Sequence, residues 1–177
     1  SPMGYVFYVI AGSIFLGISL GAYCQLYYSV KSVLFSWYLL TVYALEKRHA
    51  LLALSQLVGE EDAQSQKEID FLSQCDKLSW RAFLKNSYEI IPTFKEMEDL
   101  LSERVQGFLE SIETIAEHDR AILCIENFWA SKNLFDFEIA AYEEAVEKYL
   151  KLRQRAPLRL ASKLFRFLDV PSIRFSS

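Results

Sequence analysis

The sequence predicts an all-α protein in which an N-terminal transmembrane helix continues into an antiparallel up-down four-helix bundle. Three observations support this fold class. The first 45 residues carry a single charged side chain, Lys31, whereas all 23 acidic residues lie in the remainder of the 177-residue chain. Only six glycines and four prolines interrupt the chain, so turns should be few and helices long. Apolar residues also recur at helical spacing through most of the charged part.

Residues 4–27 form the predicted transmembrane helix. This stretch is uncharged and, at about 1.5 Å per residue, is long enough to cross a hydrocarbon core of about 30 Å. A cleaved signal peptide is the alternative, because Leu20, Gly21 and Ala22 resemble a small-residue cleavage site. The apolar stretch is longer than a signal core of roughly 7 to 15 residues, and no basic segment precedes it, which favours the membrane anchor.

The membrane helix is expected to continue into the next domain, residues 28–156, as one rod. Neither proline nor glycine occurs between Gly21 and Gly59, and a helix that is apolar nearly all round must be buried on most sides. A second membrane pass over residues 33–45 is the alternative, but this stretch is short and no turn precedes it. The residues expected to be buried along the rod are Val30, Val33, Leu34, Trp37, Leu40, Tyr43, Ala44 and Leu45.

Three further helices are predicted after Gly59. The sequence Gly-Glu-Glu-Asp at residues 59–62 is a turn whose acids suit the positive end of a helix, so a second helix is expected over residues 63–87. Pro92 predicts a break, and the capping-box pair Thr93 and Glu96 predicts the start of a third helix.

The third helix is expected to carry a coiled-coil-like apolar seam and to end near Asn133. A continuous helix over residues 93–155 would be roughly 95 Å long and could not be covered by shorter neighbours. Asp119 interrupts the seam. It is expected either to be buried with a polar partner or to lie in water because the seam shifts locally. The seam positions are Met97, Leu101, Val105, Phe108, Ile112, Ile115, Ile122 and Trp129.

The fourth predicted helix, residues 134–155, carries a stripe of two tyrosines and two small apolar residues. Tyr142, Ala145, Val146 and Tyr149 recur at the spacing of a packed a/d stripe. A tyrosine ring suits the interior of such a stripe provided that its hydroxyl finds a partner. We therefore expect these four residues to belong to the core of the bundle.

The same stripe resembles a motif of the LemA family. Tyr142, Ala145, Val146 and Tyr149 match the family pattern Y-N-x-A-V-x-x-Y-N, with Glu143 and Leu150 in place of its two asparagines. The residues that extend the resemblance on either side are Tyr27, Tyr28, Ser29, Trp37, Lys47, Arg48 and Leu51, and Pro157, Leu160, Ala161, Phe165, Phe167, Pro171 and Phe175.

The resemblance implies a bacterial four-helix bundle anchored in a membrane, without assigning a reaction. Relatives are linked with a membrane-embedded zinc metalloprotease, and one branch belongs to magnetosome membranes. What the resemblance implies is therefore a location in the bacterial cytoplasmic membrane, or in a membrane derived from it, and a membrane-protein partner such as that metalloprotease.

Residues 157–177 form a predicted basic amphipathic tail. From Lys148 onward the chain holds eight basic residues and one acid, whereas the rest is acidic. Arg159, Lys163 and Arg166 share one helical face and apolar residues another, which is the pattern of an interfacial helix. If the four helices alternate in direction, the tail returns to the bilayer, so these three residues are candidate membrane-surface contacts. Packing of its apolar face on the bundle is the alternative.

The predicted membrane segment contains a stripe of small residues, Ser13, Gly17 and Gly21, spaced four apart. Such a stripe permits close approach of a second helix, either from another copy of the chain or from a partner. The alternative is that these are ordinary membrane glycines.

Basic residues follow the membrane segment and none precedes it. Lys31, Lys47 and Arg48 lie on the C-terminal side of the segment. Because positive charge is retained on the cytoplasmic side of a membrane, this asymmetry predicts a single-pass protein with a cytosolic body.

Catalytic motifs are scarce in the sequence. A carboxylate-bridged di-metal centre needs two Glu-x-x-His motifs, and only Glu46 with His49 fits. The two histidines do not form H-E-x-x-H, and neither a Gly-rich phosphate loop nor G-x-S-x-G is present. We predict that the protein is not an enzyme and has no cofactor, and the acidic body argues against nucleic-acid binding.

These features together predict a membrane-anchored helical scaffold or adaptor that organises a bacterial membrane complex. Two alternatives remain open. One is a ligand-sensing bundle with an extracytoplasmic body, which would contain a polar-lined cavity. The other is a purely structural membrane homo-oligomer.

Overall fold

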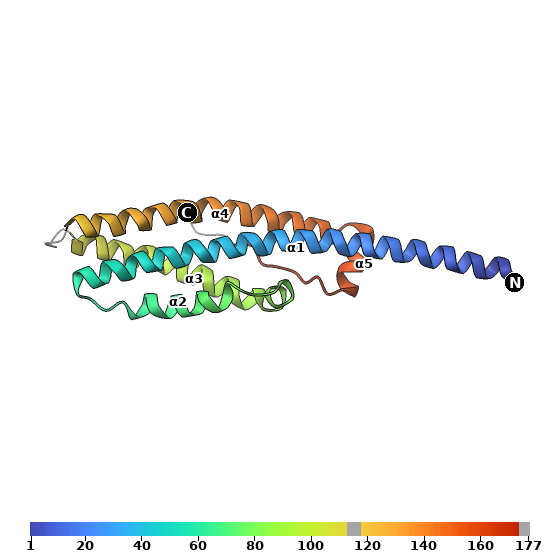
Figure 1. Cartoon of the computed structure of the whole chain (residues 1–177), viewed down its shortest axis with the longest axis horizontal. Coiled ribbons are helices and arrows are strands. Elements are labelled where there is room, and N and C mark those ends of the chain that lie inside the picture. The colour runs from blue at the N-terminus through green and yellow to red at the C-terminus, as the bar shows by residue number, and fades with distance from the viewer. Residues whose placement is uncertain (113–117, 174–177) are drawn as a thin grey trace.

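The described part of the chain contains five helices and no strand, which confirms the all-α prediction. The structure, a computed structural model, describes residues 1–112 and 118–173 (Figure 1). The helices are α1 Pro2–Val58, α2 Ala63–Cys75, α3 Trp80–Ile112, α4 His118–Arg153 and α5 Ala156–Leu164.

Helix α1 is one unbroken helix, as predicted. The side chain of Ser1 accepts a hydrogen bond from the backbone of Gly4 at its start. Gly59 ends it in the left-handed conformation with φ of 77°, and the amide of Glu60 then donates 3.0 Å to the carbonyl of Ser55. Because α1 does not reverse between these ends, the alternative of a second membrane pass is wrong.

The first part of α1 stands free of the rest of the protein. Among residues 2–21, all of which the structure describes, no side chain is buried, and Ala22 is the first buried residue. The free segment extends well beyond the other helices (Figure 1). At about 1.5 Å per residue it is roughly 30 Å long, and it is apolar and long enough to span a membrane.

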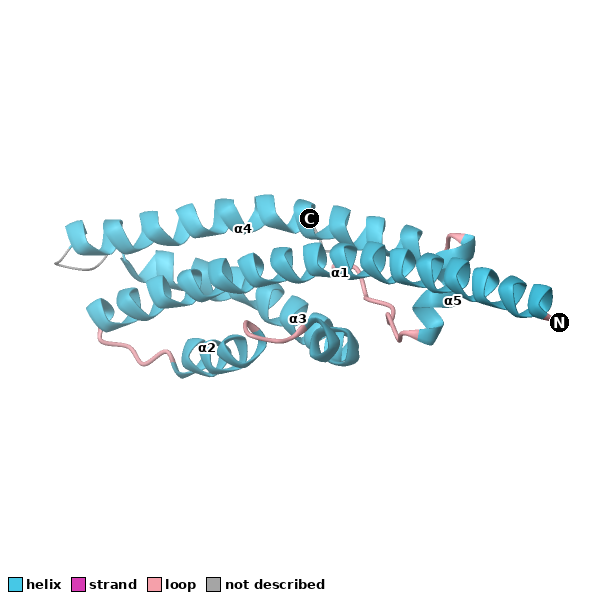
Figure 2. Cartoon of the chain, turned by 45° about the vertical axis from the view of Figure 1, so that its right-hand side comes forward, coloured by secondary structure: helices cyan, strands magenta, loops and turns pink. Residues whose placement is uncertain are grey.

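The rest of α1 is the central element of the helical body. Helix α4 lies along it on one side, whereas α2 and α3 lie along another (Figures 1 and 2). Followed along the chain, α1 to α4 alternate in direction (Figure 1). Helix α2 is short, so it covers only part of the length of α1.

The predicted buried face of α1 is largely confirmed. Leu34, Tyr43 and Leu45 are half-buried, and the remaining predicted residues are fully buried. The side of α1 opposite this face is open, since Tyr28 and Phe35 are 71% and 62% exposed. The buried members are Val30, Val33, Trp37, Leu40 and Ala44.

The prediction of one helix over residues 63–87 and a break at Pro92 is wrong. The break follows Cys75, and the hydroxyl of Ser79 accepts from the amide of Ala82 to cap α3. Pro92 lies inside α3 on its exposed side, and the helix continues through it. The hydroxyl of Thr93 donates 2.8 Å to the carbonyl of Glu89 within the helix, instead of capping a new one.

The predicted turn near Asn133 is also wrong, because α4 runs through this position without interruption. Helix α3 ends at Ile112 and α4 begins at His118, so the long rod is divided earlier than expected.

Asp119 is exposed, which agrees with the interpretation that it lies in water. Of the predicted seam, Leu101 and Val105 are buried, Met97 and Phe108 are half-buried, and Ile122 and Trp129 are exposed; the side chains of Ile112 and Ile115 lie outside the described residues.

The C-terminal tail folds back across α1 where the free segment joins the body. Helix α5 runs across α1 in both views (Figures 1 and 2). The ring centroid of Tyr23 lies 5.3 Å from that of Phe165 and 5.4 Å from that of Phe167. Leu158 and Ala161 are buried, so part of the tail packs on the body, as the alternative interpretation expected. Leu164 and Leu168, on the predicted apolar face, are exposed.

Truncation of Trp37 tests this core. Its side chain is fully buried and packs against Phe94, with the ring centroids 4.9 Å apart. Its indole nitrogen donates a hydrogen bond of 3.1 Å to the carbonyl of Cys75. Trp37→Ala should lower the free energy of unfolding by roughly 3 to 5 kcal/mol, measured by circular dichroism of the full chain in detergent during urea titration. The matched control Phe35→Ala, exposed on the same helix, should change it by less than about 0.5 kcal/mol; equal losses would contradict this packing.

Candidate functional site: a buried charge network beside a cavity

A network of five charged side chains, four of them buried and Arg104 half-buried, lies between α1, α2 and α3. Lys47 of α1 forms an ion pair with Glu98 of α3. The neighbouring Arg48 is fully buried. Its Nη1 donates a hydrogen bond of 2.6 Å to Glu98 Oε1, and its Nε donates one of 3.0 Å to Glu68 Oε1 of α2. Arg104 of α3 completes the network with Nη1 2.6 Å from Glu68 Oε2. The two carboxylates thus bridge three helices.

Each carboxylate is held by several donors. The Glu68 carboxylate accepts hydrogen bonds from Arg48, Arg104 and the side-chain amide of Gln64. The Glu98 carboxylate accepts hydrogen bonds from Lys47 and Arg48. The network holds three cations and two carboxylates, so it carries one surplus positive charge. Among the described residues, Arg48 Nη2 and Arg104 Nε are buried without a hydrogen-bond partner.

The ionisation of Glu98 follows from these neighbours. Burial by itself would raise the pKa of the Glu98 carboxyl, but the positive charges of Lys47 and Arg48 act more strongly. The pKa of Glu98 therefore lies below its usual range, and the side chain is a carboxylate at neutral pH.

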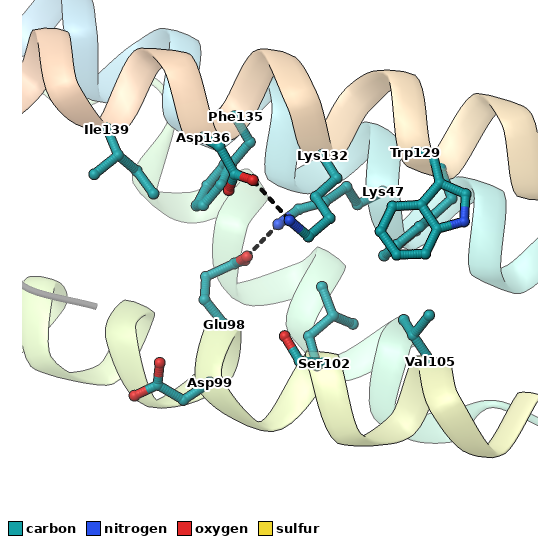
Figure 3. Close-up of a pocket in the computed structure, with 12 residues that line it drawn as sticks. Lys47, Glu98, Asp99, Ser102, Val105, Trp129, Lys132, Phe135, Asp136 and Ile139 are labelled. Carbon is teal, nitrogen blue, oxygen red and sulfur yellow. Dashed lines mark hydrogen bonds and ion pairs between the residues drawn. The ribbon is translucent and has the colours of Figure 1, made fainter. Parts of the chain in front are cut away.

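A cavity of about 380 Å³ opens between α1, α3 and α4 beside this network (Figure 3). Lys47 and Glu98 form its charged inner wall, and the Lys47 ammonium lies 3.7 Å from the ring centroid of Phe135. At the rim, Lys132 Nζ lies 2.6 Å from Asp136 Oδ2. Asp99 and Ser102 add polar groups to its walls. The other lining residues are apolar: Leu101, Val105, Phe128, Trp129 and Ile139.

The cavity suits an amphipathic small molecule better than a metal ion. Both lysines on its walls already face a carboxylate, and aromatic rings supply apolar surface. Within the described residues, no group of three or more His, Cys, Asp or Glu side chains lies close enough to hold a metal ion. Glu46 and His49 face a different, more open groove between α1 and α4.

The four residues of the tyrosine stripe lie in or beside the core. Tyr142, Val146 and Tyr149 are buried and Ala145 is half-buried. The Tyr149 hydroxyl donates 2.7 Å to the carbonyl of Leu168, whereas among the described residues the Tyr142 hydroxyl has no hydrogen-bond partner. Burial raises the pKa of both phenols. The stripe therefore joins α1 and the tail to α4.

The small residues Ser13, Gly17 and Gly21 lie on the free segment of α1. Added Cβ atoms at Gly17 and Gly21 would meet nothing within 4 Å, and the hydroxyl of Ser13 donates 2.8 Å to the carbonyl of Val9 in its own helix. The stripe therefore has no contact with the body, and its role in helix association stays a prediction.

The three candidate membrane-surface residues are exposed, but they do not share one helix. Arg159 and Lys163 lie on α5. Arg166 lies beyond its end with φ of 57°, and the amide of Phe167 donates 2.9 Å to the carbonyl of Ser162, which closes the helix. The predicted single basic face is therefore shorter by one residue.

The topology argument from Lys47 and Arg48 needs correction. Both are buried and paired with carboxylates, and they lie far along α1 from the free segment. They do not act as free positive charges close to a membrane, which are the charges that set orientation. Of Lys31, Lys47 and Arg48, only Lys31 is exposed close to the free segment, and the cytosolic side of the body stays a prediction.

Sequence reasoning missed Glu68, Glu98 and Arg104 as members of the site. A signal was present, because Glu98 stands at an apolar seam position between Phe94 and Leu101. Carboxylates at seam positions need buried cations, and Lys47 and Arg48 are adjacent cations on a rod otherwise almost free of charge.

Comparison of the chain with protein-family models, curated proteins and solved structures finds no match.

Neutralising Glu98 should destabilise the protein, because Arg48 would keep its charge in a buried site with one partner fewer. Lys47 would lose the carboxylate that opposes the lowering of its pKa by burial. Glu98→Gln is expected to lower the free energy of unfolding by roughly 3 to 5 kcal/mol in urea titration at pH 7. Glu96→Gln, exposed and two residues away on the same helix, is the matched control and should cost less than about 0.5 kcal/mol. A loss for Glu98→Gln no larger than for the control would show that the ion pairs contribute nothing.

The same carboxylate predicts a pH dependence. The folded-state pKa of Glu98 lies below its ordinary value of 4.5, so its stabilising contribution is complete above that value and is lost as pH falls through the folded-state pKa. The stability difference between the unmodified chain and Glu98→Gln should therefore shrink as urea titrations are repeated from pH 7 into the acid range. A difference that grows on acidification would contradict the assigned charge state.

Proposed function

We propose that the protein is a single-pass scaffold or adaptor of the bacterial cytoplasmic membrane whose cytosolic body is an antiparallel four-helix bundle of the LemA type. The observation that carries this proposal is the continuity of α1. One helix supplies both the free apolar segment, residues 2–21, and the central buried face of the body.

The surface of the body supports a role in binding other proteins. Large apolar side chains outside the free segment are exposed, and Tyr28, Phe35 and Phe137 are 71%, 62% and 79% exposed. Exposed aromatic side chains on a rigid helical surface are typical of protein-protein contact sites. A membrane-protein partner, such as the metalloprotease linked with LemA relatives, would meet this surface close to the bilayer.

The alternating directions of α1 to α4 support the bundle within this proposal (Figure 1). The tyrosine stripe, through which the sequence resembles the LemA family, joins α4 to α1, since the ring centroids of Tyr142 and Trp37 lie 6.5 Å apart. A role without catalysis follows from the scarcity of catalytic motifs in the sequence.

A ligand-sensing bundle with an extracytoplasmic body is the second candidate, and the cavity favours it. Its walls combine the Lys47–Glu98 pair with aromatic surface, as a site for an amphipathic ligand requires. Because α1 forms one wall and also leads to the free segment, a ligand that shifts α1 would alter the membrane end of the same helix.

The side of the membrane on which the body lies separates the two candidates. Single cysteines are introduced at Ser73, exposed on α2, and at Ser1, after Cys24 and Cys124 are replaced by serine. With a cytosolic body, a membrane-impermeant maleimide should label position 1 in intact cells and position 73 only after permeabilisation. The reverse pattern would favour the sensor, and both positions labelled only after permeabilisation would overturn the membrane span.

A further inference from the structure

Helix α5 exposes apolar side chains although its other face is buried. Leu158 and Ala161 pack against the core. Leu160 and Leu164, one turn apart, are instead 66% and 64% exposed. With 3.6 residues per turn, these two leucines form an outward stripe that no described part of the chain covers.

A basic groove lies next to this stripe. Arg159 and Lys163 of α5 line it together with Arg153 and Gln154 at the end of α4, and it encloses about 450 Å³. Arg153 Nη1 also lies 3.6 Å from Asp169 Oδ1, so Arg159 and Lys163 are the main cations of the groove. They favour an anionic oxygen-rich group such as a phosphate, because a guanidinium fork matches its geometry.

The groove and the two leucines lie near the point where the free segment of α1 joins the helical body. Tyr23, next to the first buried residue of α1, contacts Phe165 at the end of α5. Helix α5 runs across α1 rather than along it (Figures 1 and 2). If residues 2–21 cross the bilayer, α5 therefore lies along its surface.

Hydrogen bonds from two other helices fix the tail in this position. Arg81 of α3 donates 2.6 Å to the carbonyl of Phe165, and Arg153 of α4 donates 2.8 Å to the carbonyl of Phe167. The indole of Trp80 stacks on the ring of Phe167 with centroids 4.9 Å apart. Because α5 is held on three helices, it cannot turn its leucines inward without breaking these contacts.

We propose that α5 is an interfacial binding site for anionic phospholipid. Leu160 and Leu164 enter the boundary between headgroups and acyl chains, and Arg153, Arg159 and Lys163 surround a headgroup phosphate. This inference rests on the proposed membrane span, since only the span brings α5 to a bilayer. Its consequence is a second attachment point that fixes the orientation of the helical body relative to the membrane.

Spin-label accessibility on the full chain tests the site. After Cys24 and Cys124 are replaced by serine, labels are attached to Leu160→Cys or Leu164→Cys in nanodiscs of phosphatidylcholine with phosphatidylglycerol. The ratio of oxygen to nickel-chelate accessibility should be about threefold or more above that of Phe137→Cys, an aqueous reference on α4. Ratios equal to the reference would overturn the proposal, including the case in which the groove takes only free phosphate.

A label at Ile10→Cys distinguishes failure of this site from failure of the span. A lipid-type ratio at position 10 with water-type ratios at 160 and 164 overturns the α5 site alone. A water-type ratio at position 10 overturns the membrane span, and the α5 site with it.

The requirement for anionic lipid is tested by charge removal. With the label at position 164, the pair Arg159→Gln and Lys163→Gln should return the ratio in phosphatidylglycerol discs to its value in pure phosphatidylcholine discs. The matched pair Lys148→Gln and Lys151→Gln removes two exposed charges from α4 and should leave the ratio unchanged. Equal effects of both pairs, or no effect of either, would overturn recognition of the headgroup by Arg159 and Lys163.

Discussion

The buried charges of Lys47 and Arg48 impose the constraint on which the packing of the body depends. Two adjacent cations inside an apolar helix are costly unless carboxylates neutralise them. Glu98 and Glu68 do so from different helices, and Arg104 returns from α3 to Glu68. A register shift of α2 or α3 along α1 would separate these charges, so the network selects one alignment among several that apolar packing alone would permit.

The continuity of α1 connects this network to the N-terminal segment. The same helix carries the free apolar stretch, the aromatic contacts with the tail at Tyr23, the Trp37 core and the ion pairs at Lys47 and Arg48. The cavity beside Lys47 and the tail that packs on Tyr23 therefore contact the same continuous helix.

Several elements were predictable because their cause is local. The free segment and the unbroken α1 follow from a run without charge, glycine or proline, and the burial of the tyrosine stripe follows from its spacing. The boundaries of α2 and α3 were not predictable in this way. The turn after Cys75 contains neither glycine nor proline, whereas Pro92, the obvious breaker, is accommodated on the exposed side of α3. Tertiary packing there outweighs local propensity.

The sequence by itself determined the helical class, the apolar N-terminal segment and the basic character of the tail, because composition and periodicity record them directly. Only the tertiary structure decided that Lys47 and Arg48 are buried with Glu68, Glu98 and Arg104, that a cavity opens beside them, and that α5 keeps two leucines exposed. Each of these depends on which helices face one another across long sequence separations. Spacing within a single helix shows which of its faces is buried, but it does not identify the helix that covers that face.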